Sequence, residues 1–353
     1  MRGRIGLLAA LAIVVGVCVG CDPGWVNPVL GTGDGSGSVP GGPPGVAAAD
    51  VDAGTPWALV DLGARGFLVY DADTCTIMSV AQNRATRYAG NGTCGYSGDG
   101  GPATSAAIDV VPTPFGAGLQ VDPDGNVSFV NASEGDIRRI DAATGTISTV
   151  APGGSVFGIC AEADGVITYL TQRTTESGGA SGDTNTELRR IDATGDHVLA
   201  DLTDLIGNVP MGLVRVGPEH YVTFTDLDDG TLDRVDLDHG VAAATPLGSD
   251  GPLLVPEAAG ADGSIYGITI DPSTTSFAGN HVFRINPDGS VVFIAGSGEP
   301  DSGTGRQSAT GGDLDLTAHA VAMTQNGNLL VASGHVVYDL VDPADARAIS
   351  STS

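Results

Sequence analysis

The chain has 353 residues, of which 42 are acidic and 15 basic, for a formal net charge of −27. This charge argues against nucleic acid or an anionic lipid surface as the main partner, because both require basic patches. A hydrophobic fraction of 41% gives the chain enough apolar surface to bury a core, which excludes an intrinsically disordered protein.

The first twenty residues have the pattern of an export signal. Arg2 and Arg4 precede an uncharged apolar run over residues 5–20, which is too short to span a bilayer comfortably. Gly20 and Cys21 resemble the lipobox of bacterial lipoproteins, although Cys18 stands where the motif usually has Leu. We therefore expect a signal peptide over residues 1–20, lipidation of Cys21, and a place in the bacterial cell envelope, with the lipid as the only membrane contact. The alternative is an ordinary cleaved signal.

Residues 21–50 are rich in Gly, Pro and Ser and carry few large side chains. Glycine and serine favour a flexible chain, and proline adds local stiffness. We expect a tether over residues 21–50 and a folded domain over residues 51–353; the alternative is that part of this segment packs against the domain.

A repeat of about fifty residues organises that domain. Its clearest copies are Ile-Arg-Arg-Ile-Asp at 137–141 and Leu-Arg-Arg-Ile-Asp at 188–192, and weaker copies lie near residues 71, 236, 286 and 339. Each unit has short Val-, Ile- and Thr-rich runs with turn-forming Asp-Gly or Asn-Gly pairs at five positions along the domain. Four-stranded units repeated in this way predict an all-β fold, a β-propeller of six four-stranded blades.

Residues 88–104, 122–127, 137–141 and 146–151 resemble one full unit of the NHL-repeat β-propeller family. The unit departs from the family at residues 132–136, where an Asn-Asn-Arg-type turn is usual. The resemblance implies a propeller that is commonly six-bladed, is used mostly for binding and is occasionally catalytic. Because fold does not define function, the function depends on the residues of the site itself.

Two polar residues stand out among the strands expected to line the central channel. Glu257 lies in Val-Pro-Glu-Ala-Ala and His319 in Ala-His-Ala-Val. If both point into the channel, they could orient a ligand or share a metal ion. The alternative is that Glu257 caps a strand end and His319 is a hydrogen-bonded core residue.

Catalytic propellers suggest a second interpretation of the channel. NHL-like lyases use several histidines around zinc, but of the six histidines here only His319 falls on an expected inner strand. Lactonase-type propellers use an axial Glu, Asn and Asp around a divalent cation, for which Glu257, Asn208 and Asp315 are candidates without a supporting spacing. We lean towards a protein that is not an enzyme and keep a cation-dependent lactonase or lyase as the alternative.

Acidic loops offer a possible calcium site. Asp99, Asp226 and Asp228 lie in loops that combine carboxylates with free carbonyls, as calcium requires, but neither loop has an EF-hand register. The alternative is that these residues only form turns. The paired arginines at 138–139 and 189–190 are expected to pack between blades and to pair with aspartates.

The cysteines fit an exported protein. Cys75 stands where another repeat has glycine, and Cys94 lies in the long insertion, so a Cys75–Cys94 disulfide is plausible outside the cytoplasm. Cys160 would remain a buried thiol. Together these observations predict an exported, lipid-anchored propeller that binds a protein, peptide or glycan at one face.

Overall fold

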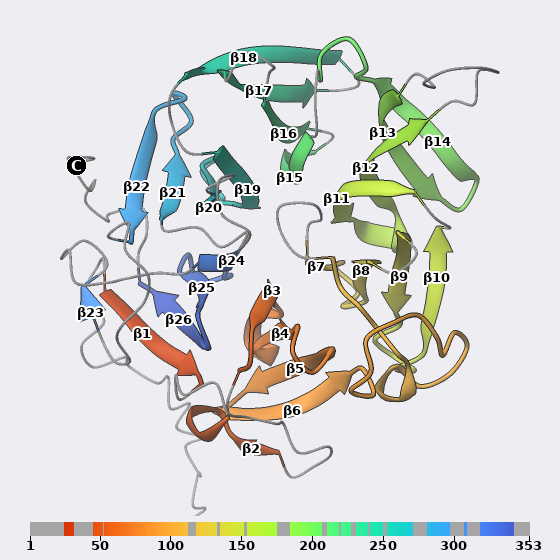
Figure 1. The fold of residues 1–353 in the computed structure, drawn as a ribbon, viewed down its shortest axis with the longest axis vertical. Helices are drawn as coiled ribbons and strands as arrows, with labels where there is room; N and C mark the ends of the chain where they lie inside the picture. The colour runs from red at the N-terminus through yellow and green to blue at the C-terminus, as the bar shows by residue number, and fades with distance from the viewer. Residues whose placement is uncertain are drawn as a thin grey trace, which may run out of the picture.

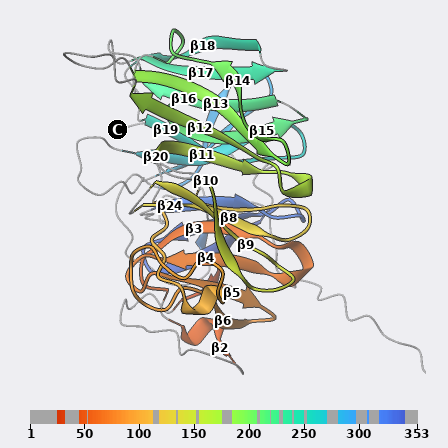
Figure 2. The ribbon, with the colours of Figure 1, turned by 90° about the vertical axis from the view of Figure 1, so that its right-hand side faces the viewer.

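The strands form six antiparallel sheets arranged as blades around a central channel, as expected from the repeat (Figure 1). Figure 2 shows the ring from its edge. The computed structural model describes residues 25–31, 45–51, 53–111, 118–132, 135–151, 154–174, 184–206, 210–218, 220–226, 231–238, 241–249, 253–270, 281–296, 307–308 and 318–341. The expected signal peptide and Cys21 lie outside these residues, and no helix within them is long and apolar enough to cross a membrane.

The first three blades follow the chain from the innermost strand outwards. Blade 1 has β3 (Pro56–Asp61), β4 (Phe67–Asp71), β5 (Thr76–Ala81) and β6 (Arg84–Ala89), with the short β2 (Val46–Ala47) outside β6. Blade 2 has β7 (Leu119–Val121), β8 (Val127–Asn131), β9 (Asp136–Ile140) and β10 (Ile147–Ala151). Blade 3 has β11 (Ser155–Ala161), β12 (Ile167–Thr174), β13 (Thr184–Asp192) and β14 (Gly195–Asp201).

The next two blades repeat the same order, and the sixth differs. Blade 4 has β15 (Pro210–Gly217), β16 (His220–Asp226), β17 (Thr231–Asp238) and β18 (Val241–Ser249). Blade 5 has β19 (Leu253–Ala259), β20 (Ile265–Ile270), β21 (Val282–Ile285) and β22 (Val291–Ala295). Blade 6 has β24 (Ala318–Met323), β25 (Leu329–Ser333) and β26 (Val336–Leu340), then β1 (Trp25–Leu30) and the short β23 (Gln307–Ser308).

The N-terminal strand closes the ring. β1 pairs antiparallel with β26, so blade 6 combines strands from the two ends of the domain, visible as red beside blue in Figure 1. Leu30 is 1% exposed and packs in the hydrophobic cluster shared by blades 1 and 6.

The segment expected to be a tether differs from that expectation in two places. Trp25–Leu30 lies in blade 6, and Val46–Ala47 pairs with β6 of blade 1. The physical reason is that Leu30 is buried and Val29 is half-buried in this pairing, so the segment adds apolar contacts at the edge of blade 6. Within the described residues, these two strands of the segment therefore belong to the blades.

The core lies between the blades. Among the described residues, hydrophobic clusters join blades 1 and 2, 2 and 3, 3 and 4, 4 to 6, and 6 and 1. Because neighbours cover both faces of a blade, every residue of β4, β8, β20 and β25 is buried. Strands buried on both faces appear in the sequence as apolar runs without strict alternation.

The Asp-Gly and Asn-Gly pairs form turns between neighbouring strands, as the repeat predicted. In the β7–β8 turn Gly125 has a φ of 87°, and in the β11–β12 turn Asp164 and Gly165 have φ values of 58° and 72°. Glycine and aspartate tolerate these left-handed conformations better than most residues do.

Candidate functional site

The central channel opens into a cavity of about 290 Å³ that is lined by all six innermost strands. The strand register identifies one equivalent lining position in each blade, opposite the first or second residue of the second strand. These positions are Asp61, Val121, Ala161, Arg215, Ala259 and Met323. All six border the cavity, so this mouth of the channel is a ring built from repeat-equivalent residues.

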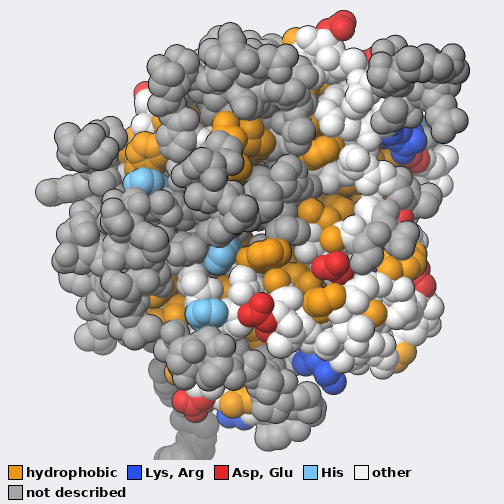
Figure 3. Space-filling model, viewed as in Figure 1, with side chains coloured by type: hydrophobic (Ala, Val, Ile, Leu, Met, Phe, Trp, Pro, Cys, Tyr) orange, Lys and Arg blue, Asp and Glu red, His pale blue; other side chains and the backbone are white. Residues whose placement is uncertain are grey.

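The ring contains one acidic and one basic residue, and they belong to opposite blades. Asp61 comes from blade 1 and Arg215 from blade 4, and β3 and β15 face each other across the channel in Figure 1. The other four ring positions are apolar. Figure 3 shows one of the two faces of the propeller, on which hydrophobic side chains and isolated acidic and histidine side chains lie near the centre.

A buried polar network holds Arg215 in place. Its Nη2 lies 3.4 Å from Oε2 of Glu162, at the end of β11 in the neighbouring blade. The other carboxylate oxygen, Oε1, accepts hydrogen bonds from the hydroxyls of Thr168 at 2.6 Å and Tyr221 at 2.7 Å. Arg190 adds a second cation, 3.6 Å from Oε1. Because Glu162 is fixed by several partners, it fixes the orientation of Arg215 at the edge of the cavity.

Glu257 lies on β19 and lines the cavity, as the sequence analysis considered. The β19–β20 register shifts between Pro256 and Ala258, so Glu257 sits at an irregularity in the innermost strand. Its Oε2 accepts a hydrogen bond from the backbone N–H of Val321 in blade 6. Glu257 therefore links blades 5 and 6 and also places a carboxylate beside the channel.

His319 has a different environment. It lies on β24, but its side chain is not among those that line the cavity; its ring centroid is 6.4 Å from that of Trp57 in blade 1. Burial, helped by the nearby His335, lowers the pKa of His319 to about 4, so the ring is neutral at pH 7. Glu257 thus lies on the cavity wall, whereas His319 lies beside Trp57 in the packing between blades 6 and 1.

The possible calcium ligand Asp99 is held by a cation from the chain itself. Its Oδ1 lies 2.6 Å from Nη2 of Arg138, and its Oδ2 accepts a hydrogen bond from the N–H of Thr149 at 2.9 Å. Burial alone would raise the pKa of Asp99, but the hydrogen bonds from Arg138 and Thr149 outweigh that effect and lower it. The side chain of Asp226 and all of Asp228 lie outside the described residues.

No group of three or more His, Cys, Asp or Glu residues that could hold a metal ion is present within the described part of the chain. Asn208 and Asp315, the other candidate ligands of the lactonase-type set, lie outside it. Of these three candidate ligands, Glu257 therefore lies beside the channel, and the other two are not among the described residues.

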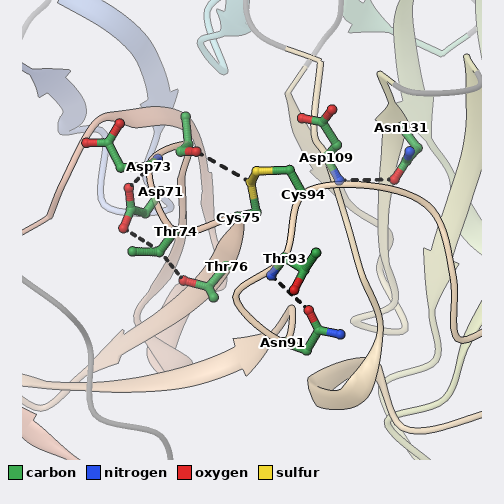
Figure 4. Close-up of a disulfide and its surroundings, with 11 residues drawn as sticks. Asp71, Asp73, Thr74, Cys75, Thr76, Asn91, Thr93, Cys94, Asp109 and Asn131 are labelled. Atoms are coloured by element: carbon green, nitrogen blue, oxygen red, sulfur yellow. Dashed lines mark hydrogen bonds between the residues drawn. A yellow bond between two sulfur atoms is a disulfide. The ribbon is translucent and has the colours of Figure 1, made fainter.

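A disulfide and a buried arginine hold the insertion between β6 of blade 1 and β7 of blade 2. Cys75, in the β4–β5 turn, forms a disulfide with Cys94 in the insertion, as drawn in Figure 4. Arg138 of β9 is fully buried and donates hydrogen bonds to the carbonyls of Ala107 and Ser97, both at 2.9 Å. Its guanidinium also lies 4.8 Å from the ring centroid of Tyr96. Arg138 thus holds the insertion against blade 2.

The other paired arginines also contact acidic side chains. Arg139 is 3.5 Å from Asp122, and Arg189 pairs with both Glu187 and Asp196. Cys160 is a buried free thiol, and burial raises its pKa to about 12. A thiol of this kind is inert as a nucleophile.

The fold and the channel mouth define the molecule as a six-bladed β-propeller with a cavity at one end of its axis. No protein-family model matches the sequence, and no curated protein matches it significantly. Similarity is found among solved structures instead. A protein of unknown function from Bacteroides thetaiotaomicron has 12% identity and a TM-score of 0.59, over 89% of this chain and 75% of its own.

A second solved structure is XC5397 from Xanthomonas campestris, described as a gluconolactonase. Its identity is 13% and its TM-score 0.53, over 82% of this chain and 87% of its own. At such low identities these likenesses show a propeller fold and nothing finer. The resemblance to NHL repeats is therefore supported at the level of fold, and membership of that family remains an expectation.

Sequence reasoning missed the ring of equivalent positions. Glu257 was singled out because it interrupts an apolar run, whereas Asp61 and Arg215 lie beside turns where charged residues are ordinary. The signal that identifies them is the register of the innermost strands, which shows that each occupies a position that is apolar in the other four blades.

Proposed function

We propose that the protein is a binding module that receives part of a peptide, protein or glycan at the mouth of its channel. The observation that carries this proposal is the cavity of about 290 Å³ lined by all six blades. Ligand pockets typically begin at about 300 Å³ and combine apolar walls with a few polar groups. The mouth therefore suits one side chain, one sugar ring or one chain end.

We further propose that the protein is exported and anchored to the membrane by a lipid on Cys21. The Cys75–Cys94 disulfide supports export, because disulfides persist mainly outside the reducing cytoplasm. Replacing Cys21 with serine should move the protein from the membrane fraction to the soluble extracytoplasmic fraction. A variant that stays with the membrane would contradict lipid anchoring.

Blocking the mouth tests the binding proposal. Ala259→Trp would place a large ring at a cavity-lining position, and Ala143→Trp in an exposed turn is the matched control. Wild-type and both variants are screened against immobilised peptides and oligosaccharides. We expect ligands that bind the wild type and the control but not Ala259→Trp. Ligands that bind all three equally would refute binding at the mouth.

A cation-dependent lactonase or lyase is the second candidate, and the position of Glu257 beside the cavity is the observation that favours it. Metal analysis of the purified protein, with thermal denaturation before and after chelation, separates the two functions. A stoichiometric divalent cation whose affinity falls in Glu257→Gln would support the enzyme. The binding proposal expects neither a bound cation nor a shift in melting temperature on chelation.

A further inference from the structure

We infer that the channel mouth selects a zwitterionic ligand of the amino-acid or short-peptide class, with a carboxylate on Arg215 and an ammonium group near Asp61. This inference rests on the proposed binding function and specifies its ligand. The two side chains occupy equivalent positions in blades 1 and 4, which are opposite in the ring. A ligand in the mouth therefore meets opposite charges on opposite sides.

Arg215 is suited to a carboxylate. Its side chain is 38% exposed, and its pair with Glu162 places only Nη2, at 3.4 Å, near that carboxylate. A guanidinium carries five N–H donors in a planar fork that matches a carboxylate. Glu162 keeps Thr168, Tyr221 and Arg190 as partners, so a ligand on Arg215 leaves the buried acid satisfied.

Asp61 is suited to a cation. Its Oδ2 accepts a hydrogen bond from the N–H of Gln325 at 3.0 Å, which fixes the carboxylate beside the cavity without neutralising its charge. Glu257 contributes a second carboxylate to the lining, so the cavity wall holds two acids and one base. A purely anionic ligand would meet a net negative wall, whereas a zwitterion is matched at both ends.

The apolar part of the wall indicates what the uncharged part of the ligand contacts. Leu59, Val121, Leu213 and Met323 all line the cavity. Apolar walls favour an apolar side chain over a hydroxylated sugar ring, because the ring's hydroxyls would lose water without gaining partners. The ligand is therefore an amino acid, or a short peptide, with an aliphatic side chain.

Calorimetric titration with four probes tests this inference on the purified full-length protein. The probes are L-leucine, N-acetyl-L-leucine without the ammonium group, L-leucine methyl ester without the carboxylate, and D-glucose. We expect L-leucine to bind about 10- to 100-fold more tightly than either blocked derivative, because each charged hydrogen bond is worth about that factor. We expect glucose to give no measurable heat.

Two charge-neutralising variants assign the ends of the ligand. Arg215→Gln should weaken L-leucine and N-acetyl-L-leucine but not the methyl ester, and Asp61→Asn should weaken L-leucine and the methyl ester but not the acetylated probe. Asparagine can still accept the Gln325 hydrogen bond, so Asp61→Asn tests charge and not folding. The matched controls, Arg173→Gln and Asp73→Asn, change exposed residues away from the cavity lining.

The results separate this inference from the proposed function. If both blocked derivatives bind as tightly as L-leucine, or if Arg215→Gln and Asp61→Asn behave like their controls, the zwitterion is refuted. If none of the amino-acid probes binds, the inference also fails. The binding function would still stand if another peptide or oligosaccharide bound the wild type and lost binding in Ala259→Trp. Melting curves of each variant confirm that it is folded.

Discussion

Replacing His319 with phenylalanine should flatten the dependence of stability on pH between pH 4 and 6.5. Burial lowers the pKa of His319 from 6.5 to about 4, so over this interval the unfolded chain binds a proton that the folded chain does not. Stability therefore rises with pH through the window, and acidification costs the wild type folding free energy that a phenylalanine does not lose. The lowering of the pKa from 6.5 to about 4 corresponds to at most about 3 kcal/mol of unfolding free energy.

Urea denaturation at several values from pH 4 to 7.5 measures this effect. The informative quantity is the difference in unfolding free energy between the variant and the wild type, because carboxylates elsewhere titrate equally in both. We expect that difference to move in favour of His319→Phe by about 2–3 kcal/mol as the pH falls from 7 to 4. His197→Phe, at an exposed histidine, is the control. Parallel stability curves for His319→Phe and wild type would refute the reasoning.

Three further changes probe the packing. Replacing Cys75 and Cys94 with serine should lower stability by about 3 kcal/mol, because the bridge closes a loop of 19 residues; denaturation with and without reductant measures it. Arg138→Met should lower stability by about 1–3 kcal/mol in urea denaturation, because it leaves the carbonyls of Ala107 and Ser97 without their donor and Asp99 without its cation. Gly267→Ala should lower the melting temperature, because its Cβ would lie 1.9 Å from a backbone oxygen, whereas Gly154→Ala, with 3.5 Å to its nearest neighbour, should have little effect.

A different result would contradict each of these three predictions. A double cysteine variant as stable as the oxidised wild type would show that the insertion is ordered without its bridge. An Arg138→Met protein with unchanged stability would mean that water replaces the guanidinium at no cost. Equal melting temperatures for the two glycine variants would show that blade 5 relaxes around the added methyl group.

The repeat made the fold predictable. Asp-Gly turns and the Ile-Arg-Arg-Ile-Asp copies are local signals, because a hairpin turn and its flanking strands are neighbours in sequence. The closing strand was missed for the opposite reason. Trp25–Leu30 lies in a glycine- and proline-rich segment, and its partner β26 is about three hundred residues away. Nothing in a local pattern reveals such a pairing.

The candidate site was predictable only in part. Glu257 stood out by its residue type, but the opposition of Asp61 and Arg215 depends on ring geometry and strand register, which composition does not contain. The calcium hypothesis for Asp99 rested on the residues of its own loop alone. Its actual partner, Arg138, follows 39 residues later on β9 of blade 2, so the competing cation was not visible locally.

The closing strand has a consequence for the order in which the molecule assembles. A chain synthesised from its N-terminus makes Trp25–Leu30 before the other described strands, but its two partners, Gln307–Ser308 and Val336–Leu340, are made about three hundred residues later. In that interval it is an unpaired edge that could join a wrong sheet. Pro28 cannot donate a backbone hydrogen bond, and the pairing with β26 is irregular between Pro28 and Leu30. The same proline that makes this last pairing imperfect thus makes premature pairing less favourable.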